Sequence, residues 1–191
     1  MIIENLALSN FRCYERVTLN PDSRFNVFYG ANGQGKTSIL EAIGLLSFLK
    51  SFRNAKNIDL LRNGETQSSI SCELLNADLN LKLDIVIHSN RKQARYNGKP
   101  CKFLSEYIGK ISGVSFSPSD LDIIKGSPEN RRNWVDKATQ ILNLDHLDLL
   151  TKYNKVLVHR NRLLKAFSQG QSRQLPEDFE IWTEELANLG S

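Results

Sequence analysis

Residues 30–37 read Gly-Ala-Asn-Gly-Gln-Gly-Lys-Thr and match the pattern GxxxxGK[ST] at every fixed position. The glycines permit backbone conformations that a side chain would block, so that successive main-chain N–H groups can point to one side. The apolar run of residues 25–29 before the pattern predicts a buried strand, and residues 36–50 predict a helix. A loop of this kind between a strand and a helix is a P-loop, which restricts the fold to the P-loop α/β class.

The chemistry of this loop follows from its position at the start of a helix. Its N–H groups and the positive end of the helix dipole are expected to face the β-phosphate of a nucleotide. Lys36 should reach the β- and γ-phosphates, and the Thr37 hydroxyl should bind Mg²⁺. The sequence therefore predicts a nucleoside triphosphate site. The residues assigned to it are consecutive: Gly30, Ala31, Asn32, Gly33, Gln34, Gly35, Lys36, Thr37 and Ser38.

The other patterns before residue 120 favour antiparallel strands. Residues 1–29 are expected to form a strand pair that ends in the apolar run at 25–29. The pair Asn97-Gly98 fits a tight hairpin turn. Another short strand is expected at residues 114–116. Three alternating segments predict a meander: residues 68–75, 79–88 and 93–97.

Helical patterns dominate the rest of the chain. Ser127 suits an N-cap, Pro128 the first helical position and Glu129 the positive end of the dipole. A long helix is expected from about Leu147, and a short amphipathic helix over residues 178–189.

The composition limits the class of protein. With 191 residues, 40% of them hydrophobic and 24% charged, the chain is large enough for one core and a smaller lobe. No apolar run approaches the roughly 20 residues that cross a bilayer, and the N-terminus lacks a basic stretch followed by an apolar one. The three cysteines are widely spaced, which predicts reduced thiols without a metal. We therefore expect a cytoplasmic protein with no membrane partner.

The net charge of +4 is unevenly distributed. Residues 149–175 contain six Lys or Arg residues and no acid. Helical spacing of three, four and three places Lys152, Lys155, His159 and Arg162 on one face. Such a face fits contacts with DNA phosphates, and an ordinary solvated face is the alternative. The candidates for DNA binding are Lys152, Lys155 and Arg162.

Motifs outside the P-loop are needed to choose a P-loop family. A GTPase would need an NKxD motif, and the nearest candidate, residues 154–157, lacks the acid. A DxxG switch is also missing, since no Asp in the chain has Gly three residues later. A metabolic P-loop kinase or phosphotransferase remains the alternative function.

Several segments resemble the ABC-type ATPase heads of the SMC and RecF families. Residues 8–14, Leu-Ser-Asn-Phe-Arg-Cys-Tyr, resemble the start of these heads. Within that group, residues 50–53 and the run from 116 to 132 are similar to RecF. Residues 160–165 and Trp182 keep the RecF order and spacing. The resemblance covers essentially the whole chain.

The resemblance implies an α/β fold, namely a P-loop NTPase of the ABC-ATPase head type with an antiparallel β meander and an α-helical second lobe. In this division residues 1–120 are the N-terminal part of an incomplete head, and residues 121–191 are part of the helical lobe. It also implies that Arg12 and Arg53 approach the nucleotide. The alternative for each is an exposed arginine in a strand or loop.

The function implied by the resemblance is that of an ATP-binding DNA replication and repair protein. Such proteins bind ATP and Mg²⁺, form an ATP-dependent homodimer, and bind DNA at gaps and at junctions of double-stranded and single-stranded DNA. They act with RecO and RecR to load recombinase in recombinational repair and the SOS response. The implied location is the cytoplasm, in association with the nucleoid.

Two parts of the ABC ATPase pattern have no clear counterpart. Such an enzyme needs a Walker B strand that ends in Asp, followed by a catalytic Glu, and no apolar strand here ends in paired acids. Residues 168–173 look like the signature motif, but residues 175–178 follow where a helix and the Walker B strand should begin. We therefore expect the chain to stop about halfway through the family's length. We also expect no catalytic residue and negligible ATPase activity in this chain alone.

Overall fold

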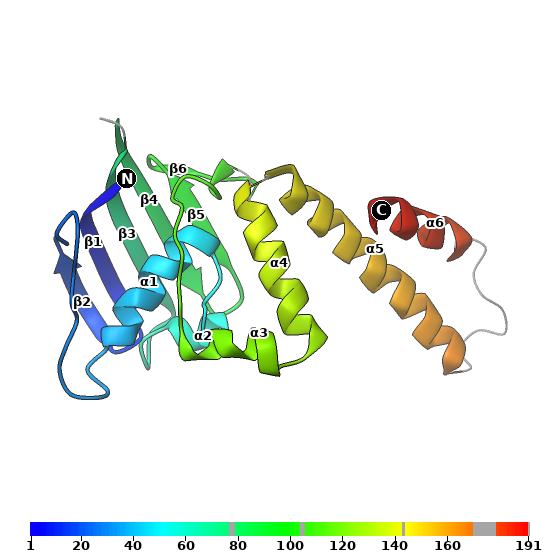
Figure 1. The fold of residues 1–191 in the computed structure, drawn as a ribbon, viewed down its shortest axis with the longest axis horizontal. Coiled ribbons are helices and arrows are strands. Elements are labelled where there is room, and N and C mark those ends of the chain that lie inside the picture. The colour runs from blue at the N-terminus through cyan, green and yellow to red at the C-terminus, as the bar shows by residue number, and fades with distance from the viewer. Residues whose placement is uncertain (77–78, 104–105, 143, 170–178, 191) are drawn as a thin grey trace. The chain divides into compact units, whose positions relative to one another are not determined.

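The structure is a computed structural model and describes residues 1–76, 79–103, 106–142, 144–169 and 179–190. Its residues form two compact units, Met1–Ile141 and Leu142–Ser191. The first unit contains a sheet and the P-loop, and the second contains two helices (Figure 1). The assignment of residues 1–120 to an ATPase head and 121–191 to a helical lobe remains a prediction, since compactness alone places the division later.

The first unit is built on a six-stranded sheet in the order β2-β1-β3-β4-β5-β6. All neighbouring strands are antiparallel, which confirms the predicted meander. Asn97 and Gly98 have φ angles of 48° and 78°, as the predicted tight turn requires. The strands are β1 (Ile2–Phe11), β2 (Tyr14–Leu19), β3 (Gln67–Asn76), β4 (Leu79–His88), β5 (Lys92–Tyr96) and β6 (Lys99–Pro100).

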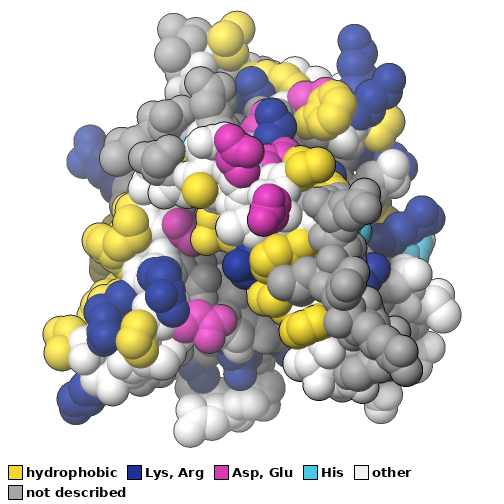
Figure 2. Space-filling model, turned by 90° about the vertical axis from the view of Figure 1, so that its right-hand side faces the viewer, with side chains coloured by type: hydrophobic (Ala, Val, Ile, Leu, Met, Phe, Trp, Pro, Cys, Tyr) yellow, Lys and Arg dark blue, Asp and Glu magenta, His cyan; other side chains and the backbone are white. Residues whose placement is uncertain are grey.

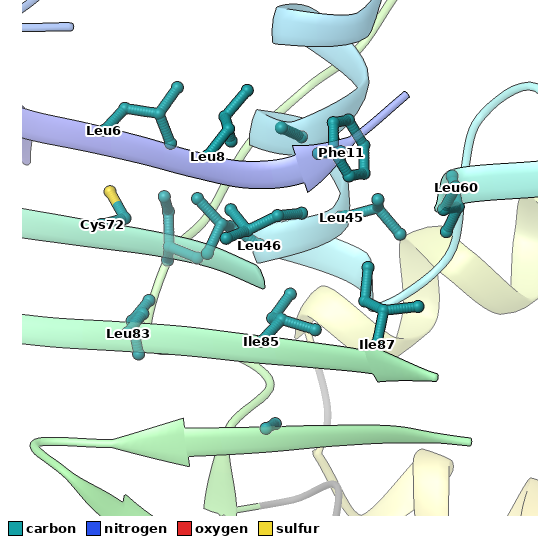
Figure 3. Packing of buried hydrophobic residues seen from close by; sticks show 14 of the residues in the cluster. Leu6, Leu8, Phe11, Leu45, Leu46, Leu60, Cys72, Leu83, Ile85 and Ile87 are labelled. Carbon is teal, nitrogen blue, oxygen red and sulfur yellow. The ribbon is translucent and has the colours of Figure 1, made fainter. Parts of the chain in front are cut away.

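Helix α1 (Lys36–Phe48) lies against one face of this sheet and confirms the helix predicted after the P-loop (Figure 1). Figure 3 shows Leu45 and Leu46 of α1 in one cluster with Leu83, Ile85 and Ile87 of β4. These side chains alternate along the strand, because every second residue of a strand points to the same face. Each buried side chain of this size contributes about 1.5–3 kcal/mol. The cluster therefore holds the P-loop helix on the sheet.

Two predicted strands are wrong. Residues 25–29 and 114–116 belong to no strand. Most of their apolar side chains are open to solvent, with Phe25 78%, Tyr29 90% and Val114 99% exposed, whereas Phe28 is half-buried against the core. A strand needs a neighbour for its N–H and C=O groups, and among the described strands none lies beside either segment. The apolar pattern is typical of a strand, but a local pattern does not indicate whether a partner strand is present.

The first unit also contains helical segments besides α1. Helix α2 (Asn57–Leu60) comes before β3, while the 3₁₀ helix η2 (Pro118–Leu121) and helix α3 (Asp122–Lys125) come after the meander. Helix α4 (Pro128–Leu142) begins at Pro128, which confirms the predicted start. In that turn the Asn130 N–H donates to the carbonyl of Ser127 at 3.1 Å.

The second unit is a hairpin of α5 (Leu144–Ser168) and α6 (Phe179–Gly190). Both predicted helices are present, although α5 begins about three residues earlier than predicted. Arg160 joins the helices, because its Nε donates to Thr183 Oγ1 at 3.0 Å and its guanidinium lies 4.9 Å from the Phe179 ring centre. Most of the signature-like segment 168–173 lies outside the described residues. Among the described helices, none is long and apolar enough to cross a membrane.

Candidate nucleotide-binding site

The backbone of residues 30–37 has the form that the glycine pattern predicts. Gly30, Gly33 and Gly35 have φ angles of 137°, 82° and 88°, a region that residues with a side chain rarely adopt. Gly35 is the N-cap of α1, and its carbonyl accepts hydrogen bonds from the N–H groups of Ser38 at 2.8 Å and Ile39 at 3.2 Å. The loop therefore leads directly into the positive end of a helix of 13 residues, a favourable place for an anion.

Lys36 places its ammonium group inside the curve of this loop. Its Nζ donates to the carbonyl of Gly30 at 2.8 Å and to that of Ala31 at 2.6 Å. An ammonium has three N–H donors, so one is left for an incoming oxygen. A cation held against a loop of this shape attracts phosphate groups.

A cavity of about 530 Å³ opens in front of the loop. This volume lies within the range of about 300–1,000 Å³ found for small-molecule sites. Three segments form its wall: the turn after β1, the P-loop with the start of α1, and the segment before β3. The lining residues are Arg12, Cys13, Asn32, Gly33, Gly35, Lys36, Thr37, Ser38, Arg53, Asp59, Leu61 and Asn63.

The wall contains most of the residues predicted from the sequence. Both candidate arginines, Arg12 and Arg53, line the same cavity as the P-loop. Gly30 and Ala31 contribute the carbonyls that hold Lys36, and Gln34 accepts a hydrogen bond from the Tyr14 hydroxyl at 3.3 Å. The sequence reasoning did not identify Cys13 or the residues of the segment before β3, because their closeness to the P-loop depends on the fold.

A carboxylate that the sequence reasoning missed holds the two arginines. Glu41, on α1, is fully buried and pairs with Arg12 through two hydrogen bonds, Nε to Oε2 at 2.8 Å and Nη2 to Oε1 at 2.7 Å. Arg53 Nη1 lies 4.0 Å from Oε2 of the same carboxylate. A signal was present in the sequence, since an acid within the apolar run Ile-Leu-Glu-Ala-Ile must find a partner if it is buried.

The main chain at Arg12 is held in an unusual conformation. Its φ angle is 54°, in the left-handed region. The Arg12 N–H donates to the carbonyl of Leu60 at 3.0 Å, and the Arg62 N–H donates to the carbonyl of Asn10 at 2.8 Å. Arg12 Nη1 also donates to the carbonyl of Asp59 at 2.6 Å. The segment around α2 therefore fixes both the backbone and the side chain of Arg12.

The residues after Arg12 pack against the P-loop itself. A Cβ atom at Gly35 would lie 2.6 Å from Cys13 Sγ and 2.6 Å from the Tyr14 hydroxyl oxygen. Burial raises the pKa of Tyr14, and the neighbouring Cys13 adds to that effect. Tyr14 therefore remains protonated and available as a hydrogen-bond donor near neutral pH. The φ angle of 88° favours glycine at position 35, and a side chain there would also have to displace Cys13 and Tyr14.

The predicted DNA-binding residues lie on α5, in the other unit. Lys152, Lys155 and Arg162 are all exposed there. His159 shares their predicted face but packs on Trp182, with ring centres 4.4 Å apart. Figure 2 shows Lys and Arg side chains in several separate groups over one face of the molecule, with hydrophobic and acidic side chains between them. The location on an exposed helix agrees with a DNA contact and equally with a solvated face.

Two basic residues of the meander, Lys92 and Arg95, do not share one surface. Lys92 and Arg95 are three positions apart on β5 and therefore point to opposite faces of the sheet. Lys92 Nζ donates to the carbonyl of Leu49 at 2.8 Å, beside the end of α1. Burial lowers the pKa of Lys92, and the positive charge of Lys50 lowers it further. The side chain of Lys92 therefore has a structural role, since it binds the carbonyl of Leu49.

Comparison with known proteins identifies the family. The family model described as "AAA domain" matches residues 5–189. The chain is 40% identical over 192 residues to the DNA replication and repair protein RecF of Lachnospira eligens. This match covers 100% of the chain and 53% of that protein. It is 38% identical over 191 residues to the RecF protein of Agathobacter rectalis, of which it covers 52%. The chain thus spans about half the length of the curated relatives that it matches.

Solved structures show the same fold. One, described as the recombination mediator protein RecF-ATP in the RecFOR pathway, matches with a TM-score of 0.92 and 32% identity. That match covers 99% of this chain and 51% of the other. A second, described as the recombination mediator protein RecF-ATPrS in the RecFOR pathway, matches with a TM-score of 0.89 over 98% of this chain. The fold is therefore the P-loop ATPase head fold predicted from the sequence. The chain belongs to the AAA domain family, and it corresponds to the N-terminal half of RecF proteins.

Proposed function

We propose that the cavity in front of the P-loop binds ATP. The observation that carries this proposal is the arrangement of three cations, Lys36, Arg12 and Arg53, around one cavity at the N-terminus of α1. A triphosphate carries several negative charges, and such charges are stabilised by a helix N-terminus and by fixed cations. The relative whose structure is described as RecF-ATP supports the choice of ATP.

We assign Mg²⁺ to the same site. The exposed Thr37 lines the cavity at the first turn of α1 and supplies a hydroxyl oxygen. Mg²⁺ is usually bound by one or two protein oxygens together with phosphate oxygens and water, and needs no cage of protein ligands. In the described part of the chain, no group of three or more His, Cys, Asp or Glu residues could hold a metal. When bound, the ion would neutralise part of the phosphate charge.

We further propose that the chain belongs to a cytoplasmic, nucleoid-associated DNA replication and repair protein. In this proposal the protein forms an ATP-dependent homodimer and binds gapped DNA or junctions of double-stranded and single-stranded DNA. It acts with RecO and RecR to load recombinase during recombinational repair and the SOS response. The support is the RecF identity of the relatives, together with the exposed Lys152, Lys155 and Arg162 as candidate contacts for DNA phosphates.

Substitution of Lys36 tests the nucleotide assignment. The Lys36→Ala and Lys36→Arg variants should fold and should lose most of their ATP affinity, because the planar guanidinium of Arg cannot replace a compact ammonium in the loop. Lys50→Ala is the matched control, since Lys50 is an exposed cation at the other end of α1 and does not line this cavity. Equal ATP affinity in folded Lys36→Ala and wild-type chains, measured by titration calorimetry, would refute the assignment.

A second experiment tests the nucleic-acid part of the proposal. Binding to duplex DNA should strengthen with ATP and weaken steeply with salt, because phosphate contacts release counterions. Transfer of the γ-phosphate to a small acceptor, with no DNA binding, would instead favour a metabolic kinase.

A further inference from the structure

The nucleotide cavity has a buried anion behind its wall. Glu41 is fully buried on α1, whose other buried residues are uncharged. We propose that Glu41 is a positioning residue: it holds the Arg12 guanidinium at the cavity wall, so that the remaining N–H groups of Arg12 can bind the phosphates of ATP. This inference rests on the proposed ATP binding.

The hydrogen bonds of Arg12 leave donors for a ligand. A guanidinium has five N–H donors. Arg12 uses Nε and one N–H of Nη2 for Glu41, and one N–H of Nη1 for the carbonyl of Asp59. One N–H on each Nη therefore remains. Because the guanidinium is planar, fixing three of its donors also fixes the direction of the other two.

The backbone at Arg12 is fixed as firmly as its side chain. The left-handed φ angle of 54° is unfavourable for a residue with a side chain. It is held by the hydrogen bonds from Arg12 to Leu60 and from Arg62 to Asn10. Strained residues that are held from several sides are concentrated at functional sites. Because Arg12 lines the cavity, its strained backbone is consistent with a role in binding there.

The stability of the core does not explain a carboxylate at position 41. A buried ion pair is often no more stable than apolar side chains of similar size, since both charges lose their hydration. Glu41 needs several donors to be accommodated, namely Arg12, Ser51 Oγ and, at a longer distance, Arg53. Arg12 and Arg53 line the cavity, whereas Ser51 is buried beside the carboxylate. The benefit of Glu41 therefore lies at the site.

Glu41 has two opposite effects on ATP binding: it positions Arg12, and its own charge repels phosphates. The negative charge of Glu41 repels phosphates, and its removal would strengthen their binding if charge alone mattered. The carboxylate charge is already compensated by Arg12, whereas a misdirected guanidinium loses short-range hydrogen bonds to phosphate. The proposal therefore requires that loss of Glu41 weakens ATP binding.

The test is a double-mutant cycle of ATP affinity with a stability measurement on each variant. Glu41→Gln should bind ATP about tenfold more weakly than wild type, the equivalent of one charge-assisted hydrogen bond. Arg12→Lys should show a similar loss, and the double variant should lose no more than either single variant, because Glu41 acts through Arg12. Glu41→Asp keeps the charge but withdraws the carboxylate, so it should also weaken binding, and it serves if Glu41→Gln fails to fold.

Two controls separate the outcomes. Leu46→Ala removes a fully buried side chain from the same helix and should lower stability while ATP affinity stays within about twofold. Unchanged or tighter ATP binding in folded Glu41→Gln or Glu41→Asp would overturn the positioning role, and so would additive losses in the double variant. If Lys36→Ala in the same assay binds ATP as wild type does, the nucleotide assignment itself fails, which is a different result.

Discussion

The Tyr14 hydroxyl donates a hydrogen bond to the main-chain carbonyl of Gln34 at 3.3 Å. This contact joins the first residue of β2 to the P-loop, 20 positions later in the chain. The ring of Tyr14 occupies the space beside Gly35, where a Cβ atom would lie 2.7 Å from its Cζ. Tyr14 therefore packs against the P-loop, next to the turn residues Arg12 and Cys13 that line the cavity.

Gly35→Ala should damage both the fold and the site. Alanine would be strained at the φ angle of 88°, and its methyl group would overlap Cys13 and Tyr14. We therefore expect the free energy of unfolding to fall by about 2–5 kcal/mol. Gly64→Ala is the control, because Gly64 has a similar φ of 84° but no atom within 4 Å of its Cβ position. That variant should lose only about 1 kcal/mol. Similar losses in the two variants, measured by urea unfolding, would contradict the packing argument.

Cys13 should report on nucleotide binding. It is exposed and lines the cavity, so a maleimide should label it readily, and saturating ATP with Mg²⁺ should slow that labelling. Cys72 is buried, and burial raises its pKa to about 12, so it should react slowly with or without ATP. Mass spectrometry of labelled peptides distinguishes the sites. Undiminished labelling of Cys13 at saturating ATP would place the nucleotide elsewhere, and the Lys36→Ala chain should show no protection.

The 191-residue chain should bind ATP without turning it over. Among the described strands, none ends in Asp or Glu, so no carboxylate stands where a Walker B strand would place one. Phosphate release assays on the purified chain should remain at the level of the Lys36→Ala variant. Steady turnover that Lys36→Ala abolishes would reveal a catalytic group that neither the sequence nor the described residues indicate.

The exposed cations of α5 should determine how steeply DNA affinity falls with salt. If Lys152, Lys155 and Arg162 contact phosphates, their replacement by Gln should weaken binding to all sequences alike. Each lost contact should reduce the slope of log affinity against log salt by about 0.9 on duplex DNA, because fewer counterions are released. Titrations on gapped DNA with ATP present, at several salt concentrations, provide the measurement.

The exposed arginines of the sheet provide the control for this experiment. Arg91→Gln with Arg95→Gln removes two exposed cations from the meander and should leave the slope unchanged. If the slope falls in this variant and not in the α5 variant, the DNA surface lies on the sheet.

The sequence alone determined those features that depend on neighbouring residues. The P-loop could be predicted because the positive φ angles of Gly30, Gly33 and Gly35 require glycine. The Asn97-Gly98 turn and the start of α4 at Pro128 follow from local backbone preferences in the same way.

Features that depend on distant partners were decided only by the tertiary structure. The apolar run at 25–29 has a strand pattern, but a strand forms only where another strand can accept its hydrogen bonds. Arg12 and Glu41 are 29 positions apart, and their pairing depends on how α1 packs on the sheet beside the β1–β2 turn. The sequence showed that a phosphate-binding loop was present; the packing of α1 and the α2 segment decided which side chains surround it, because burial forces each charged group to find a partner in space.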